Sequence, residues 1–335
     1  MRARQIDESD VRVRPGRRGS RPRSKRRPEH ADATEAMVTA VDRGRWTCAL
    51  DGDAASPRVV AMRARELGRT PIVVGDRVGL VGDLSGTPDT LARIVRVAER
   101  RTVLRRTADD TDPFERVVVA NAEQLVIVTA VAEPPPRAGF VDRCLVAAYA
   151  GGLSPVLCLT KADLGDPEPF AAQYRDLDLP VVVTRRDTCR RIELAELGDR
   201  LAGRVSAFVG HSGVGKSTLV NALVPDAERA VGEVTAIGKG RHTTTAAVAL
   251  ALPGDGGGWV VDTPGVRSFG LAHVTPDDVP AAFDDLAAAI EDCPRGCGHL
   301  GPPADPECAL DVLVEQGKLR PGRLAALRRV LVALQ

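Results

Sequence analysis

The chain has 335 residues, too many for one small core and enough for two or three domains at ~100 to 200 residues each. Its composition, 44% hydrophobic and 27% charged, is that of a soluble globular protein, and a net charge of +1 taken alone argues against a polyanion partner. The charge is unevenly spread, however. Met1 to Pro28 holds eleven Arg or Lys against Asp7, Glu8 and Asp10, so this end is +8 and the remainder −7.

Residues 1–29 predict a disordered basic tail, because they contain almost no large apolar side chains to offset the entropy of ordering. The tail is either a solubilising extension or an arm for nucleic acid. It lacks the apolar stretch of a secretory signal, and no run of 18 apolar residues follows. We therefore expect a cytoplasmic protein that does not span a membrane.

Residues 30–100 predict a small β-barrel. Five short segments of strand character are separated by Asp-Gly, Gly-Asp and Pro: EAMVTAV, RWTCAL, RVVAMRA, PIVVGDRVGLV and TLARIVRV. Five strands in so short a span suit an OB-type barrel that binds RNA, and an SH3-like barrel would give nearly the same pattern.

Residues 101–275 predict an α/β domain, since near-continuous Val/Ile/Leu runs alternate with helical stretches. The expected strands lie in VVVANAEQLVIVTA, PVLCLTKAD, PVVVT, RVSAFVG and GWVVDTPG, and the expected helices in FVDRCLVAAYA and IELAELGDRLAG. Residues 276–335 show no further strand pattern. Leu324, Leu327, Val330, Leu331 and Leu334 recur at helical spacing and predict a helical C-terminal domain.

The sequence GHSGVGKST from Gly210 to Thr218 matches the phosphate-binding loop pattern between a predicted strand and a predicted helix. Backbone N–H groups of this loop can surround a β-phosphate, Lys216 supplies a mobile charge and Ser217 a hydroxyl for Mg²⁺. We expect the nucleotide to contact the whole loop: Gly210, His211, Ser212, Gly213, Val214, Gly215, Lys216, Ser217 and Thr218.

A second motif, Asp262-Thr-Pro-Gly265, ends a predicted strand beyond this loop. Asp262 can hold Mg²⁺ through water, and the N–H of Gly265 can sense a γ-phosphate. Between the two motifs, the polar segment GKGRHTTTA offers Thr243 or Thr244 as a further hydroxyl ligand for the same Mg²⁺.

A third motif, Thr160-Lys161-Ala162-Asp163, also follows a strand. The carboxylate of Asp163 can accept hydrogen bonds from the ring N–H and the exocyclic amine of guanine, which adenine cannot offer, while the Lys161 stem lies against the base. The alternative is an ordinary strand-ending turn with a capping Asp.

Cys293, Cys297, His299 and Cys308 form a C-x3-C-x-H-x8-C cluster, in contrast to the scattered Cys48, Cys144, Cys158 and Cys189. Three thiolates and one imidazole make a closed tetrahedral shell for one structural Zn²⁺. Buried thiols are the alternative for the cluster, and a small buried hydrophobe is the expected role of the other four.

The base motif precedes the phosphate motifs, the reverse of the order in ordinary GTPases. With a β-barrel in front and a Cys/His cluster behind, this order resembles the circularly permuted, ribosome small-subunit-dependent GTPases of the RsgA (YjeQ) family over about residues 30 to 335. The resemblance implies a late 30S assembly factor that hydrolyses GTP with one Mg²⁺, holds one Zn²⁺, is stimulated by the 30S subunit and binds 16S rRNA. We expect it to act as a monomer.

The chain departs from that family in three places. Thr160 stands where GTPases usually have Asn, TRRDT (Thr184 to Thr188) matches the usual base loop poorly, and the spacing of the metal cluster differs. Val266 stands where many GTPases have a water-orienting Gln, so His242 is the candidate for that catalytic role beside Lys216. The alternative for His242 is a solvated loop residue or a contact to RNA phosphate.

We expect RNA to meet the tail, the barrel and the Arg-rich joint at Arg100 to Arg106, by shape and phosphate contacts, since aromatic residues are only 3% of the chain. Two other functional classes stay open at this point. One is a P-loop ATPase or small-molecule kinase, and the other is a nucleotide-gated RNA-binding scaffold with little catalysis.

Overall fold

The structure, a computed structural model, divides the chain into two compact units, Met1–Ala31 and Asp32–Gln335. It describes residues 30–334 except 54–55, 88, 107–115, 188–191, 226, 228–246, 255, 264–270 and 272–273. The predicted tail, residues 1–29, lies outside the described residues. Among the residues described, no helix combines the length and the apolar character needed to cross a membrane.

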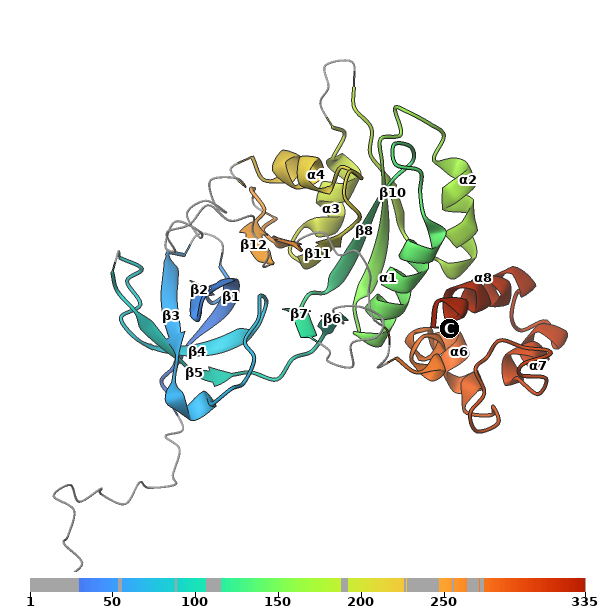
Figure 1. The fold of residues 1–335 in the computed structure, drawn as a ribbon, viewed down its shortest axis with the longest axis horizontal. Helices are drawn as coiled ribbons and strands as arrows, with labels where there is room; N and C mark the ends of the chain where they lie inside the picture. The colour runs from blue at the N-terminus through green and yellow to red at the C-terminus, as the bar shows by residue number, and fades with distance from the viewer. Residues whose placement is uncertain are drawn as a thin grey trace, which may run out of the picture. The chain divides into compact units, whose positions relative to one another are not determined.

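The first part of the second unit is a closed barrel of five strands (Figure 1). In hydrogen-bonded order these are β1 (Thr34–Asp42), β2 (Arg45–Leu50), β3 (Arg58–Arg63), β5 (Ala92–Val97) and β4 (Arg77–Gly82). Strand β4 pairs back with β1 and closes the barrel, and β3 and β5 run parallel while the other pairs are antiparallel. This connectivity confirms the OB-type barrel over the SH3-like alternative.

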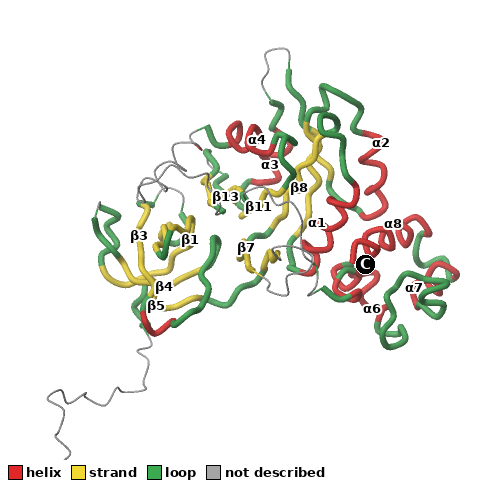
Figure 2. Tube along the Cα trace, in the orientation of Figure 1, coloured by secondary structure: helices red, strands yellow, loops and turns green. Residues whose placement is uncertain are grey.

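The α/β part contains a sheet in the order β10 (Val181–Val183), β9 (Ser154–Thr160), β8 (Gln124–Ala130), β11 (Val205–Val209), β13 (Trp259–Asp262) and β12 (Val248–Ala251). All neighbours are parallel except β12, which is antiparallel to β13. The base-motif strand β9 therefore precedes the phosphate-loop strand β11 along the chain, yet both belong to one parallel sheet. Figure 2 shows these strands with helices beside them.

The two faces of this sheet pack against different helices because side chains alternate along a strand. Leu125 and Ile127 of β8 belong to the core cluster that contains α1 (Ala138–Ala150). Val126 and Val128 belong to the cluster that contains α3 (Ala195–Leu201) and α4 (Lys216–Leu223). Every residue of β8 is buried, as predicted for a strand covered on both faces.

The apolar run VVVANAEQLVIVTA, in which strand structure was expected, forms two strands that belong to different sheets. Asn121 has a φ of +53°, and β7 (Arg116–Ala120) pairs instead with β6 (Val103–Arg106) in a separate two-stranded sheet. The side chain of Asn121 stabilises this break, because it donates to the Gly75 carbonyl at 3.0 Å and accepts from the Arg101 N–H at 2.9 Å. The sequence analysis also missed β6, β12, α2 (Glu168–Ala171) and the 3-10 helix η3 (Ala172–Leu177).

The C-terminal part is helical, as predicted, and within the described residues no strand follows β13. It contains the short 3-10 helices η4 (Pro276–Asp278), η5 (Pro280–Ala282) and η6 (Val332–Leu334) and the helices α6 (Asp284–Ile290), α7 (Ala309–Glu315) and α8 (Pro321–Leu331). Leu324, Leu327, Val330 and Leu331 of α8 are buried in the same core cluster as α1. The buried Arg323 of α8 adds ion pairs at 2.7 Å to Asp285 of α6 and at 2.6 Å to Asp178, which follows η3.

Candidate nucleotide and metal sites

The loop from Gly210 to Gly215 joins the carboxyl end of β11 to the N-terminus of α4. Gly213 and Gly215 have φ values of +83° and +93°, which favour glycine, and a Cβ on Gly210 would lie 2.6 Å from the Val128 carbonyl oxygen. Ser212, Ser217 and Thr218 are exposed. The loop therefore presents backbone N–H groups and hydroxyls at a helix N-terminus, an arrangement suited to phosphate oxygens.

Lys216 begins α4 and is buried, and its ammonium group is held by the end of the neighbouring strand β13. Its Nζ donates to the Asp262 carboxylate and, at 2.8 Å, to the Thr263 carbonyl. The structure thus brings together Lys216, at the start of α4, and Asp262, at the end of β13, for which phosphate and Mg²⁺ roles were predicted. Asp262 and the exposed Ser217 are oxygen donors of the kind that Mg²⁺ prefers.

Thr160, at the end of β9, connects the base motif to the phosphate loop. Its hydroxyl is buried, donates to the Val214 carbonyl at 2.5 Å and lies 3.3 Å from the Thr129 carbonyl. The residue that stands in place of the usual Asn therefore makes a contact to the neighbouring loop. Val214 itself is buried among the side chains that pack against α4.

Asp163 is exposed, and one of its carboxylate oxygens accepts the Arg186 backbone N–H at 3.2 Å. The segment after β10 is tied to the base motif by two further backbone bonds, from Ala162 N–H to the Thr184 carbonyl at 3.2 Å and from Thr184 N–H to the Leu159 carbonyl at 2.8 Å. Lys161 has a φ of +57°, and its ammonium group donates to the Glu133 carbonyl.

One cavity of about 630 Å³ joins the base motif to the phosphate loop. This volume is within the range of ~300 to 1,000 Å³ that is usual for small-molecule sites. Its walls include Thr160, Lys161 and Asp163 from the base motif and Gly210, His211, Ser212, Gly213, Gly215, Lys216, Ser217 and Thr218 from the phosphate loop. The structure thus brings together at one cavity two motifs that lie about 50 residues apart in the sequence. Their order along the chain is the reverse of that in ordinary GTPases.

Thr184, Arg185 and Arg186 also line this cavity, although the sequence analysis noted them only as a poor match to the usual base loop. Their position directly after β10 was the available signal, because ligands of parallel sheets bind at the carboxyl ends of strands. His211 lies on the cavity wall too, with its ring 4.0 Å from the Phe140 ring of α1. Burial and, to a smaller extent, the nearby Arg137 lower the pKa of His211 below its ordinary value.

Four predicted residues, His242, Thr243, Thr244 and Gly265, lie outside the described residues, as does Val266. Cys189 lies there too. Cys48, Cys144 and Cys158 are buried, and burial raises the pKa of Cys48 and of Cys158 to about 12. These three thiols therefore have the inert core role predicted for them.

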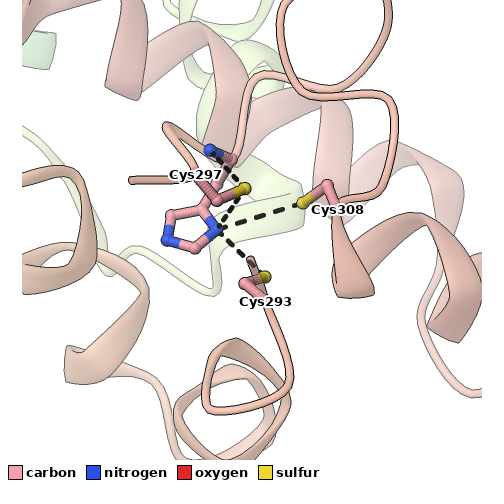
Figure 3. Close-up of side chains that lie close together, drawn as sticks. Cys293, Cys297 and Cys308 are labelled. Atoms are coloured by element: carbon pink, nitrogen blue, oxygen red, sulfur yellow. Dashed lines mark hydrogen bonds between the residues drawn. The ribbon is translucent and has the colours of Figure 1, made fainter. Parts of the chain in front are cut away.

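The second candidate site is the metal cluster of the C-terminal part (Figure 3). The Nδ1 atom of His299 lies 3.5 Å from the Cys293 sulfur, 3.6 Å from that of Cys297 and 3.9 Å from that of Cys308. Ligand atoms of a tetrahedral Zn²⁺ at ~2.0 to 2.3 Å lie about 3.5 to 3.8 Å from one another, so the donor set and its spacing fit zinc. All four ligand atoms lie within 4.8 Å of one another.

Comparison with known proteins relates this chain to one family. The sequence profile described as RsgA GTPase matches residues 97–272. The small ribosomal subunit biogenesis GTPase RsgA of Pseudomonas aeruginosa is 38% identical over 271 residues, which cover 78% of this chain and 76% of that protein. The protein of the same name from Chlorobaculum tepidum is 39% identical over 261 residues, which cover 75% and 82%.

Solved structures agree with this similarity. The crystal structure of YjeQ from Thermotoga maritima matches with a TM-score of 0.63 and 27% identity, covering 90% of this chain and 98% of that one. The structure of YloQ, described as a circularly permuted GTPase, matches with a TM-score of 0.63 and 22% identity, covering 92% and 97%. At that identity the likeness to YloQ establishes a shared fold only.

Proposed function

The chain belongs to the RsgA GTPase family, and on that premise we propose that it hydrolyses GTP in the biogenesis of the small ribosomal subunit. The observation that carries the proposal is that one cavity is lined by both the base motif and the phosphate loop. A site built only for phosphate would not need Asp163 at its far end.

In the proposed mechanism the phosphate loop binds and orients the nucleotide. Its backbone N–H groups and Lys216 hold the β- and γ-phosphates, while Ser217 and Asp262 hold the metal, with Thr243 or Thr244 as a further ligand. Mg²⁺ bound there neutralises charge on the phosphate oxygens. Because Lys216 and Asp262 contact each other directly, a nucleotide must compete with this ion pair to engage the ammonium group.

Base selection rests on Asp163. Its carboxylate accepts two hydrogen bonds from guanine, so Asp163→Asn places an amide opposite the guanine amine and loses one acceptor. We expect GTP affinity to fall about 100-fold and affinity for xanthosine triphosphate to rise, since the xanthine carbonyl can accept from the new amide. Fluorescent-nucleotide titration measures both. Asp166→Asn, the same charge change in a neighbouring exposed residue, is the control.

The attacking water needs an orienting group, and we assign this to His242, because the apolar Val266 cannot form a hydrogen bond to water. We expect His242→Ala to lower stimulated turnover while GTP affinity stays unchanged. Normal turnover in that variant would leave His242 with no role beyond a loop or RNA contact.

GTP turnover with and without purified 30S subunits tests the function directly. Stimulated hydrolysis that ATP does not inhibit supports a GTPase of late 30S assembly. Equal competition by ATP would favour a P-loop ATPase or kinase. GTP binding without stimulated hydrolysis would favour the nucleotide-gated scaffold.

We place the 16S rRNA contact on the tail, the barrel and the joint, with one correction. Arg100 is not a free phosphate ligand, since its guanidinium is bound to the buried Asp76 at 2.7 and 2.9 Å and to the Pro71 carbonyl at 2.8 Å. Residues 30–100 hold ten basic and ten acidic residues, so the attraction to phosphate must come from the tail and from Arg101, Arg105 and Arg106. Removing residues 1–28 should therefore flatten the salt dependence of 30S binding.

The Cys/His cluster takes one structural Zn²⁺ in this proposal, since all four tetrahedral positions are occupied by protein ligands. The chain from Asp262 enters this domain within about 15 residues, so γ-phosphate contacts at Gly265 can shift the domain and change ribosome affinity. Equal 30S affinity with GDP and with a GTP analogue would contradict this coupling. We place the protein in the cytoplasm as a monomer.

A further inference from the structure

We propose that Asp277 positions His299 for metal binding, and thereby ties the metal cluster to helix η4. The inference rests on the zinc site proposed above and adds a residue outside the four-ligand set. The observation behind it is a hydrogen bond of 2.7 Å between Asp277 Oδ1 and Nε2 of His299.

This hydrogen bond decides which ring nitrogen of His299 is free. A neutral imidazole carries its proton on one nitrogen, and a carboxylate can only accept a hydrogen bond. Nε2 therefore carries the proton toward Asp277, and the lone pair of Nδ1 faces the three cysteine sulfurs at 3.5 to 3.9 Å. A carboxylate in this position also raises the basicity of the metal-bound nitrogen.

Hydrogen bonds also fix the backbone around His299. Its φ of +59° is uncommon for a residue other than glycine. Asp305 accepts the N–H groups on either side, from Gly298 at 3.0 Å and from Leu300 at 2.9 Å, and Arg328 donates to the His299 carbonyl at 3.0 Å. Asp305 thus shapes the loop, whereas Asp277 alone among these groups touches the ring.

Asp277 also differs from the four ligands in where it lies along the chain. It belongs to η4, 22 residues before His299, and η4 begins 14 residues after Asp262. The adjacent Asp278 anchors η4, since its carboxylate accepts from the Thr275 N–H at 2.7 Å and from the Thr275 hydroxyl at 2.8 Å. Asp277 is therefore a residue close in sequence to Asp262 of the nucleotide site that contacts a ligand of the metal cluster.

The expected loss of zinc affinity on removal of the Asp277 carboxylate depends on how exposed this carboxylate is to water. Carboxylates that hydrogen-bond a metal-binding His typically change metal affinity by ~10- to 100-fold. The side chain of Asp277 is 69% exposed, while that of His299 is 1% exposed. Water competes for this carboxylate, so we expect the lower end of that range, about tenfold.

The test measures the zinc dissociation constant of the full-length chain by competition with a chromogenic chelator. We expect Asp277→Ala to bind zinc about tenfold more weakly, and Asp277→Asn to lose less, because the amide oxygen still accepts from Nε2. Glu315→Gln, the same loss of one negative charge at the exposed end of α7, should match the unaltered chain.

Thermal unfolding separates positioning from a general structural role. For the positioning role, Asp277→Ala lowers the melting temperature of the zinc-loaded chain and leaves that of the chelator-treated chain unchanged. An equal loss in both forms, or a zinc affinity equal to that of Glu315→Gln, would overturn the proposal. If the unaltered chain binds no zinc, the metal site itself fails, and this inference fails with it, whereas the GTPase function is unaffected.

Discussion

The phosphate loop offers mainly backbone N–H groups, whereas the metal cluster offers only side-chain atoms. Gly210, Gly213 and Gly215 are needed because a Cβ would clash with Val128 or strain the backbone. The cluster instead consists of three thiols and one imidazole, with Asp277 bound to the His299 ring and Asp305 and Arg328 bound to the backbone around it. The first site is therefore encoded in one contiguous segment, and the second in ligands and supports spread over about 50 residues.

The largest effect is expected from a substitution that disrupts the nucleotide site alone. Lys216→Ala removes the cation that binds Asp262 and that we propose binds the phosphates, so we expect GTP turnover to fall by about 1,000-fold or more. Zinc content, measured by metal analysis, should stay at one ion per chain. Lys318→Ala, an exposed lysine of the C-terminal part, is the control for loss of a positive charge. Loss of zinc in Lys216→Ala would show that the two sites are not independent.

The reverse experiment breaks the metal cluster. Cys308→Ser removes one of the four ligands of the proposed zinc site, so we expect zinc affinity to fall by several orders of magnitude. Binding of a structural zinc contributes folding free energy. The C-terminal part should then unfold at a lower temperature. GTP affinity, measured by titration, should change less than threefold. Cys48→Ser, at a buried thiol outside the cluster, separates metal loss from the cost of a polar group in a core.

These two sites also differ in how much of them could be predicted. The phosphate loop, Asp262 and the base motif were each predicted at the end of a strand from local sequence patterns alone. The cluster ligands were predicted from Cys and His spacing. Asp277 was not, because nothing in a single sequence indicates which carboxylate reaches a site through tertiary packing. Thr184 and Arg186 were noted only as a poor match to the usual base loop, although they directly follow a predicted strand.

Prediction of the fold from the sequence was limited in the same way, by features that depend on tertiary packing. Alternating and continuous apolar runs predicted the five barrel strands and most of the α/β core. Strand β12 was missed because it has only four residues, VALA, two of which are alanine, and gains its place through pairing with β13 and β1. The break at Asn121 was missed because it depends on a hydrogen bond to Gly75, 46 residues away.

A smaller effect is expected at Thr160, where a side chain supports the otherwise backbone-built site. Thr160→Val keeps the shape but leaves the buried Val214 carbonyl without its hydroxyl donor, at a cost of ~1 to 3 kcal/mol. We expect GTP affinity to fall about tenfold, measured by titration, and Thr160→Ser to restore most of it. If Thr160→Val binds GTP normally, the hydroxyl is not part of what positions the phosphate loop.

The smallest expected effect lies between the two sites, where α1 meets α8. Asp142 of α1 is buried, and Arg329 of α8 lies 3.7 Å away with its guanidinium over the Tyr174 ring. Burial raises the pKa of Asp142 to about 6, against the opposing pull of Arg329. In the unfolded chain this carboxyl has its ordinary pKa, near ~4.

A raised pKa in the folded state means that the folded chain binds this proton more tightly than the unfolded chain. The contribution of Asp142 to stability is therefore most favourable below about pH 4 and is lost as the pH rises to about 6. Asp142→Asn should remove this slope and be more stable than the unaltered chain above pH 6. Urea unfolding between pH 4 and 7.5 measures the stability difference between the two proteins across this range, in which proton effects at the Cys/His cluster cancel. Asp199→Asn, an exposed acid of α3, should leave the slope unchanged, and an unchanged slope in Asp142→Asn as well would mean that Arg329 fully compensates the buried charge.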